Sequence, residues 1–162
     1  MNMLVLCCLF PLSLLAGQQD LEMLLKELDT VIECKDSYIL PKEKELSELR
    51  LRLKNTKNNR QKYELCDKLF TAYLHYQADS ALSYVERKQE LLPFLDEPVL
   101  EQELIINRAE VMGVMGMYSW AEQLLSQVKP GILTPELLGY YYRTMRANYG
   151  WFADYLVNKD LE

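Results

Sequence analysis

The sequence has few of the residues on which β-sheets and catalytic sites depend. Its 162 residues include six Gly, six Pro, four Cys and one His, and runs of alternating apolar and polar residues are nearly absent. The lack of such runs argues against a β-sandwich, a barrel or a doubly wound sheet. A single His without a CxxC pair excludes a zinc site built from Cys and His. Lys and Arg are outnumbered by Asp and Glu, 18 to 24, which argues against non-specific binding to nucleic acid, because such binding needs clustered positive charge.

The chain does carry what a folded helical domain needs. Apolar residues make up 49% and charged residues 26%, a balance typical of globular rather than disordered chains. Leu21, Leu24, Leu25, Leu28 and Ile32 follow the helical spacing i, i+3, i+4, i+7 and i+11, and similar stripes recur almost to the end. We therefore predict an all-α fold with about seven helices after an N-terminal segment.

The breaks between these stripes predict where helices begin and end. Pro41 removes an amide donor, so we expect a helix to start or kink there. Residues 54–59 form a polar connector, residues 129–135 form the clearest loop, and Pro98 marks another break. Asp79 is expected to cap the helix that follows it, because its carboxylate can accept hydrogen bonds from the first free amides.

The N-terminal segment has the pattern of a targeting signal rather than of a helix in the folded domain. Residues 4–17 are apolar or small without a charged side chain, and the first charge of the chain is Asp20. A membrane-spanning helix needs roughly 20 apolar residues, so this shorter run fits a secretory signal peptide over residues 1–17. We expect export to the periplasm. A buried N-terminal helix is the alternative.

Export would leave two thiols, Cys34 and Cys66, in an oxidising compartment where they could form one disulfide. Both also lie within helical patterns, and a single Cys on a helix is usually a small buried apolar residue. The sequence leaves both alternatives open.

Two parts of the chain repeat each other. Residues 63–85 align with residues 103–125, at an offset of 40 residues. In each segment a small residue, Ala81 or Ala121, would let the second helix of a hairpin approach the first closely. The positions expected to pack the repeats are Leu69, Ala81, Ala109, Gly116, Tyr118 and Ala121.

Gly116, Tyr118 and Ala121 match the turn glycine, the aromatic residue and the small residue of one well-known motif. In these positions the chain resembles a tetratricopeptide repeat. The resemblance implies antiparallel helical hairpins stacked as a right-handed array. A generic antiparallel helical bundle is the alternative. We divide the chain into the segment 1–17, an N-terminal helical hairpin over 18–58, and repeats over 59–162, with units at about 60–97, 99–133 and, in part, 135–162.

A more specific resemblance covers nearly all of the chain after residue 17. The residues that carry it are Leu28, Asp29, Ile32, Tyr38, Lys42, Glu43, Asp79, Ser80, Ala81, Tyr84, Gly116, Ala121, Tyr141, Tyr142, Ala153, Asp154 and Tyr155. In them the chain resembles a Bacteroidota family of membrane-bound sensor-regulators. The family implies a signal peptide and an exported tetratricopeptide-like region, followed by a transmembrane helix, a coiled coil and a LuxR-like helix-turn-helix. We expect only the N-terminal part here. Direct nucleic-acid binding is therefore not assigned to this chain, and a membrane link would come only from the segments that follow.

Stacked hairpins form an inner groove lined by the first helix of each pair. The positions that we expect to contact a partner are Tyr63, Phe70, Tyr73, Glu103, Asn107, Glu110 and Tyr140. Some tetratricopeptide domains hold a terminal carboxylate with Lys, Asn and Arg at such positions. Only Asn107 matches here, so we expect no such clamp and instead an extended peptide or a partner helix held by aromatic side chains.

Aromatic residues gather near the C-terminus. The chain has eleven Tyr and two Trp, several of them within residues 140–155. Tyr and Trp supply much of the anchoring energy at protein interfaces. They could equally pack between repeats, so internal packing and self-association remain alternatives for this segment.

No residue pattern predicts a catalytic, metal or cofactor site. His75 is most simply a polar residue near a helix end, and Ser80 beside Asp79 lacks an oriented base. Residues 113–116, GVMG, lack the Lys and the preceding strand of a phosphate loop. We predict a non-enzymatic interaction or sensory domain without a cofactor, whose partner is a peptide or protein. An enzyme would need a pocket that gathers His75 with carboxylates.

Overall fold

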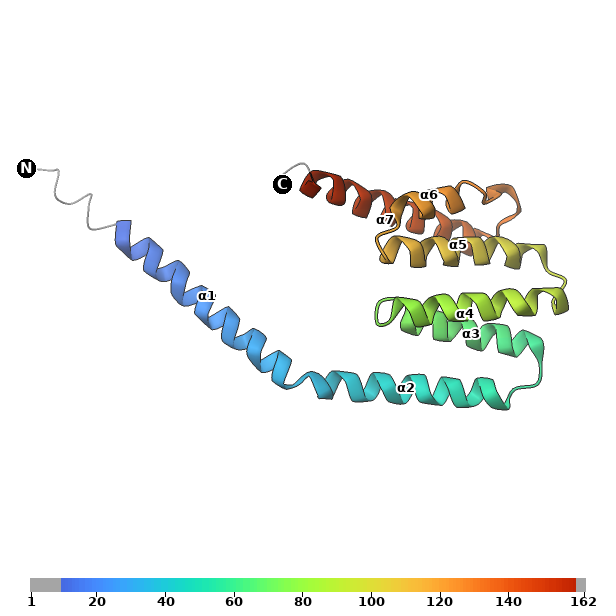
Figure 1. The fold of residues 1–162 in the computed structure, drawn as a ribbon, viewed down its shortest axis with the longest axis horizontal. Helices are drawn as coiled ribbons and strands as arrows, with labels where there is room; N and C mark the ends of the chain where they lie inside the picture. Colours follow the sequence, from blue (N-terminus) through green and yellow to red (C-terminus); the bar gives the residue numbers. More distant parts are fainter. Residues whose placement is uncertain (1–9, 160–162) are drawn as a thin grey trace, which may run out of the picture. The chain divides into compact units, whose positions relative to one another are not determined.

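The computed structural model describes residues 10–159, with the side chains of residues 21–157 and of Lys159. Within this range the chain forms seven α-helices, two short 3-10 helices and no strand (Figure 1). The helices are α1 Phe10–Glu33, α2 Lys35–Asn55, α3 Asn59–Tyr73, α4 Ala78–Leu91, α5 Pro98–Val114, α6 Tyr118–Leu125 and α7 Pro135–Lys159, with 3-10 turns at Leu92–Phe94 and Pro130–Ile132. The all-α prediction is confirmed.

The chain forms two compact units, residues 1–45 and residues 46–162. The hairpin expected over residues 18–58 spans both units, because α2 runs from the first into the second. The second unit contains α3 to α7 and the buried hydrophobic core of the described chain. Everything that positions the candidate sites lies in this second unit.

The predicted signal segment falls largely outside the described residues. Residues 1–9 are not described, and residues 10–17 are described only as the backbone of the first turns of α1. Among the helices that are described, none is both long and apolar enough to cross a membrane. The signal peptide therefore stays a prediction.

The junction between α1 and α2 differs from the expectation. α2 begins at Lys35 and runs through Pro41, so the expected helix start at Pro41 is wrong, while the alternative of a kink there stays a prediction. Ser37 and Pro41 are both exposed, so water can bond the carbonyl oxygen that the missing amide of Pro41 leaves unpaired. The helices separate instead at Cys34, whose thiol is free and exposed, whereas the free thiol of Cys66 is buried.

The second unit is built from stacked hairpins. α3 packs on α4, α5 packs on α6, and α7 packs on both α5 and α6 (Figure 1). Ala81, Ala109, Ala121 and Leu69 are completely buried where these helices meet. Small side chains at such positions let helix backbones approach closely, so the hairpins interlock. The tetratricopeptide-like array predicted from the repeats is confirmed.

The helix ends follow local rules with one departure. Asn58 precedes α3, and its side-chain oxygen accepts a hydrogen bond of 3.0 Å from the amide of Gln61. α4 is preceded by Gln77, which makes no capping bond, and Asp79 lies inside the first turn. The prediction that Asp79 caps this helix is therefore wrong. Its carboxylate instead lies where the positive end of the helix dipole favours negative charge.

The turn between α5 and α6 depends on Gly116. Its φ angle is +78°, in the left-handed region, where a residue with a β-carbon is strained. The amide of Met117 donates to the carbonyl of Met112 at 2.8 Å, which closes a Schellman-type helix end. Gly116 therefore reverses the chain so that α6 returns along α5.

Candidate functional site

The first helices of the hairpins line one groove. It has a volume of about 850 Å³ and is bordered by α3, α5 and α7 together with the loops that precede α5 and α7. Five carboxylates line it, against three arginines and His75: Asp67, Glu97, Glu103, Glu110 and Glu136. Apolar surface comes from residues that include Leu74, Leu137 and Trp151. The groove is thus partly apolar and carries an excess of acidic groups.

The structure brings five of the seven predicted contact residues together on this groove. They are Phe70, Glu103, Asn107, Glu110 and Tyr140. The other two, Tyr63 and Tyr73, are buried away from it, at 3% and 4% exposure. The ring of Tyr63 lies under the ammonium of Lys88, and Tyr73 stacks on Tyr84 with ring centroids 5.6 Å apart.

The displacement of Tyr63 and Tyr73 has a geometric cause. On α3 the groove is lined by Arg60, Asp67, Phe70, Thr71 and Leu74. The predicted stripe is rotated around the same helix from this set and shares only Phe70 with it. An apolar stripe marks the buried face of a helix, and the groove lies beside that face rather than on it.

Lys88 of α4 does not line the groove but is completely buried beneath it, where it bonds to three residues of the groove floor. Its Nζ donates hydrogen bonds to Asp67 Oδ1 at 2.5 Å, Glu103 Oε1 at 2.5 Å and Asn107 Oδ1 at 2.7 Å. The same Nζ lies 4.6 Å from the centroid of the Tyr63 ring. All three ammonium protons therefore have acceptors, which is the condition under which a buried charge is tolerated.

Sequence reasoning missed Lys88 because charged side chains are usually solvated. Its position did contain a signal. Ala81 and Val85 mark the buried stripe of α4, and Lys88 follows at the next i+3 position on that stripe. A charged residue on the inner face of an otherwise apolar stripe predicts a buried partner of opposite charge.

The network continues from Lys88 toward α7. Asn107 Nδ2 donates to the hydroxyl oxygen of Tyr140 at 3.0 Å, and the Tyr140 hydroxyl donates to Glu110 Oε2. Burial raises the pKa of the Glu110 carboxyl, and burial followed by the nearby Glu110 charge raises the pKa of Tyr140. Both polar groups of Asn107 are thus engaged within the chain.

The rim of the groove carries its other charges. Arg60 donates to Glu97 at 2.6 Å and to Glu64 at 3.2 Å, and these hydrogen bonds raise the pKa of the Arg60 guanidinium. Arg143 and Arg146 lie along α7. Exposed pairs of this kind contribute little to stability. The charged side chains of the rim can therefore change partners, whereas those bonded to Lys88 are held in place.

His75 lines the same groove as Asp67, Glu103 and Glu110. It is exposed in the turn after α3, and no hydrogen bond orients its ring among the residues that the structure describes. General-base catalysis requires an imidazole held against the proton that it removes. The groove therefore brings His75 and carboxylates together, but no hydrogen bond among the described residues orients the imidazole as a general base would require.

Side chains of α7 pack closely on the backbone of α5 at Gly113. A β-carbon at Gly113 would lie 3.2 Å from Asn148 Oδ1 and 3.2 Å from Trp151 Cζ3. Asn148 Nδ2 also donates to the carbonyl oxygen of Tyr118 at 3.1 Å, and the Tyr118 ring packs on Phe152 at 5.6 Å. Gly113 thus sets how near α7 can come.

The described residues contain no group of three or more His, Cys, Asp or Glu side chains placed to hold a metal ion. Asp67 and Glu103 instead meet the ammonium of Lys88, and Glu110 meets the hydroxyl of Tyr140.

Comparison with known families identifies this arrangement. Residues 32–162 match the model of the SusR N-terminal TPR domain. The chain belongs to this family. Tetratricopeptide domains generally mediate protein–protein interactions and are generally non-enzymatic, and both properties suit a groove lined by stacked hairpins. No curated protein and no solved structure matched the chain.

Proposed function

We propose that this chain is the non-enzymatic interaction and sensory part of a regulator, and that its groove binds an extended peptide of a protein partner. The observation that carries the proposal is the groove of about 850 Å³ that runs across α3, α5 and α7. Its size falls in the range of ligand-binding clefts. The family membership supports an interaction role.

The charge of the groove supports one kind of peptide. The ammonium of Lys88 is shared between Asp67 and Glu103, so the floor keeps a net negative charge. The Asp67 side chain is 44% exposed and can accept further hydrogen bonds. A Lys or Arg of the peptide would meet this charge, while apolar side chains beside it would contact Leu74, Leu137 and Trp151.

A selection experiment tests the groove. The folded chain is screened against a phage-displayed library of random peptides, and we expect enriched sequences that pair a basic residue with apolar ones. Thr71 is exposed on the groove wall, so Thr71→Arg should weaken the selected peptides at least about tenfold by titration calorimetry. Ser83→Arg, at an exposed position of α4 outside the groove, is the matched control. Equal binding by both variants would exclude the groove.

Export belongs to the same proposal and has its own test. The apolar run of residues 4–17 supports it. An alkaline phosphatase fusion after Glu162, which is active only outside the cytoplasm, should be active in a bacterial host. An inactive fusion that is present in normal amounts would refute export and leave the groove unaffected.

We also propose that the groove performs no catalysis. The unaligned His75 and the family's general role support it. A turnover that His75→Ala abolishes, with Tm unchanged, would overturn this part of the proposal.

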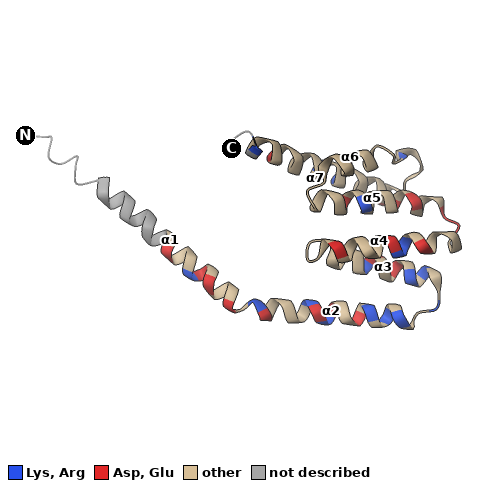
Figure 2. Cartoon of the chain, viewed as in Figure 1, with Lys and Arg blue, Asp and Glu red and all other residues tan. Residues whose placement is uncertain are grey.

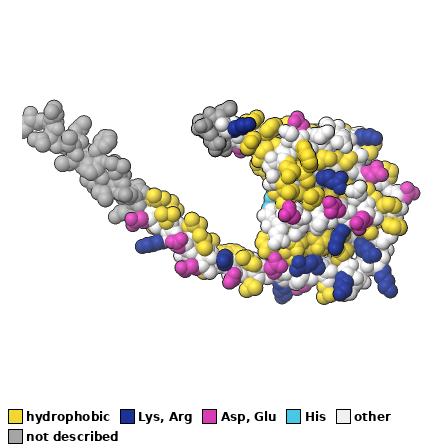
Figure 3. Space-filling model, in the orientation of Figure 1, with side chains coloured by type: hydrophobic (Ala, Val, Ile, Leu, Met, Phe, Trp, Pro, Cys, Tyr) yellow, Lys and Arg dark blue, Asp and Glu magenta, His cyan; other side chains and the backbone are white. Residues whose placement is uncertain are grey.

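A second candidate function is self-association through the aromatic surface of α6 and α7. Trp120 is 65% exposed, Tyr142 54% and Tyr155 50%. Figure 3 shows apolar side chains gathered over these helices. Sedimentation equilibrium should then show a dimer that Trp120→Ser weakens, and a monomer at high micromolar concentration would exclude it.

A further inference from the structure

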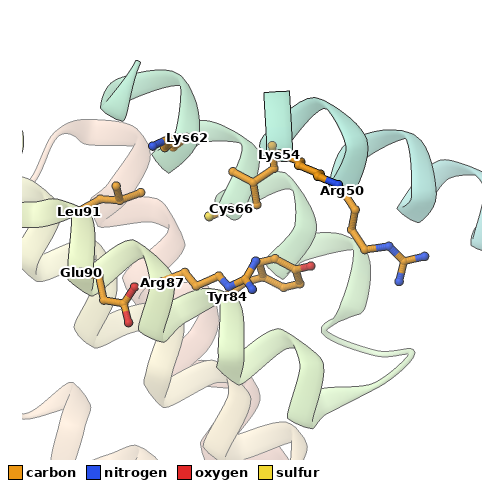
Figure 4. A pocket seen from close by; sticks show the side chains of 9 residues that line it. Arg50, Lys54, Lys62, Cys66, Tyr84, Arg87, Glu90 and Leu91 are labelled. Atoms are coloured by element: carbon orange, nitrogen blue, oxygen red, sulfur yellow. The ribbon is translucent and has the colours of Figure 1, made fainter. Parts of the chain in front are cut away.

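A second cavity lies between α3, α4 and the part of α2 that belongs to the same compact unit. Its volume is about 650 Å³, and it shares no lining residue with the groove. Figure 4 shows its side chains arriving from three helices: Arg50 and Lys54 from α2, Lys62 from α3 and Arg87 from α4. A cavity of this size can hold a small organic molecule.

The charge of this cavity is opposite to that of the whole chain. Four of its nine lining residues are Lys or Arg, and Glu90 is its one carboxylate, whereas the chain has a net charge of −6. Figure 2 shows Lys and Arg gathered at the end of α2 and the start of α3. Neither Lys54 nor Lys62 forms an ion pair with any described residue. Like charges placed together repel one another, so the cluster favours a bound anion.

Two of the cations are held in position by tyrosine side chains. Arg50 donates to the hydroxyl oxygen of Tyr73 at 2.8 Å, and the Arg87 guanidinium lies 5.3 Å from the centroid of the Tyr84 ring. Tyr73 and Tyr84 stack on each other at 5.6 Å. Positively charged groups that are already positioned lose less conformational entropy when a ligand binds.

The remaining lining residues suit an organic anion rather than a bare ion. Leu53 and Leu91 supply apolar surface beside the Tyr84 ring. The Cys66 thiol is buried, and burial raises its pKa, so it stays neutral and does not repel an anion. A ligand could therefore place its charge among the cations and its apolar part against these side chains.

We propose that this cavity binds a small phosphate ester, with the phosphate held by Lys54, Lys62 and Arg87 and the organic part resting on Leu53, Tyr84 and Leu91. A phosphate ester dianion matches the excess of positive charge, and Lys and Arg are the side chains that commonly bind phosphate. This site is independent of the peptide groove, so either proposal can fail alone.

The test measures binding of phenyl phosphate to the full chain by titration calorimetry at low ionic strength. Inorganic phosphate and benzoate are compared, because the first lacks the apolar part and the second carries one charge. We expect phenyl phosphate to bind most tightly, and its affinity to fall as salt is added. In NMR spectra it should shift the methyl resonances of Leu53 and Leu91, and not those of Leu137 in the groove.

Variants locate the site. Lys62→Gln and Arg87→Gln should each weaken phenyl phosphate about threefold, and the double variant about tenfold. Glu90→Gln should strengthen it, because a repelling carboxylate is removed. Lys68→Gln makes the same charge change at an exposed position of α3 outside the cavity, and should leave affinity unchanged. All variants are checked for unchanged Tm.

Three results would overturn the proposal. They are no binding of phenyl phosphate at low ionic strength, equal affinity in Lys68→Gln and the double variant, and methyl shifts confined to the groove. Benzoate binding as tightly as phenyl phosphate would likewise exclude recognition of a phosphate dianion.

Discussion

Arg87 and Lys88 are neighbours on α4, yet Arg87 lines the basic cavity and Lys88 bonds to residues of the groove, which shares no lining residue with that cavity. Lys88 is completely buried and each of its protons is bonded within the chain. Arg87 is exposed, and the cations near it outnumber the one carboxylate of its cavity. Two adjacent positions of one helix therefore carry different kinds of charge. The hydrogen bonds of Lys88 are all made within the chain, whereas Arg87 lies in a cavity with an excess of positive charge.

The contrast distinguishes two uses of charge. A buried ion whose hydrogen bonds are all made by the protein holds helices together, and little capacity remains for a ligand. A cluster in which one sign of charge predominates keeps a net repulsion that a bound molecule of opposite charge can relieve. Pairing, more than proximity to a cavity, separates structural charge from binding charge.

The largest expected effect comes from removing the satisfied charge. Lys88→Met leaves Asp67, Glu103 and Asn107 without their shared donor, and we expect a loss of about 3 kcal/mol in the free energy of unfolding. The estimate stays at the lower end because Asp67 is partly exposed to water. Urea titration measures it, with Lys68→Met as the exposed control. Equal stability of the two variants would mean that Lys88 contributes no more to the free energy of unfolding than an exposed lysine does.

The next prediction asks whether the close packing at Gly113 contributes as much to stability as the buried charge of Lys88 does. Gly113→Val places methyl groups against Asn148 and Trp151, where a β-carbon already lies 3.2 Å from both side chains. We expect a loss of about 2 kcal/mol from overpacking, read as a lower Tm. Gly150→Ala is the control on α7, since nothing lies within 4 Å of its added β-carbon. It should be neutral or stabilising by up to about 1 kcal/mol.

A pH titration sharpens the comparison within the groove itself. Burial raises the pKa of Glu110 in the folded state above its ordinary value of 4.5. The folded chain therefore binds this proton more tightly than the unfolded chain does. As pH rises from 4.5 through the higher pKa of the folded state, the Glu110 carboxyl lowers the free energy of unfolding. Glu110→Gln keeps an acceptor for Tyr140 and should be more stable than the wild type at pH 7.

The Glu110→Gln advantage should shrink as pH falls below 4.5, where the wild-type carboxyl is protonated in both states. Urea midpoints at several pH values measure it. A stability difference that does not change between pH 4 and pH 7 would contradict the raised pKa.

The smallest effect belongs to the rim. Arg60 pairs with Glu97 and Glu64, but its side chain is 46% exposed. Arg60→Gln should cost no more than about 0.5 kcal/mol, and the cost should disappear at high salt. A loss comparable to that of Lys88→Met would mean that exposed and buried pairs contribute alike in this fold.

The sequence was sufficient for the array because its signals are local. Completely buried alanines at 81 and 121, 40 residues apart, and a left-handed glycine at 116 each impose one geometry on a hairpin. The errors at Pro41 and Asp79 have the opposite origin. Solvent can replace the bond that Pro41 removes, and a first-turn carboxylate need not be the cap.

The candidate sites were less predictable because they depend on which helices meet. Periodicity placed Phe70 and Glu110 on the groove helices, but could not tell the groove from the buried face beside it, where Tyr63 and Tyr73 lie. Lys88 is understood only through partners 15 to 21 residues away in the chain. The basic cavity gathers residues from three helices, and no single segment carries its pattern.

The ammonium of Lys88 also limits which substitutions this sequence can accept during evolution. Its three bonded partners come from α3 and α5, so a change at any one of them alters the charge balance at the other two. Substitutions there should be accepted in descendants of this gene as coordinated sets, such as an apolar residue at 88 together with neutral residues at 67 and 103. Arg87, which is exposed, and Lys62, which is half-buried, have no such shared partners, so a change at one of them should not require a change at the other.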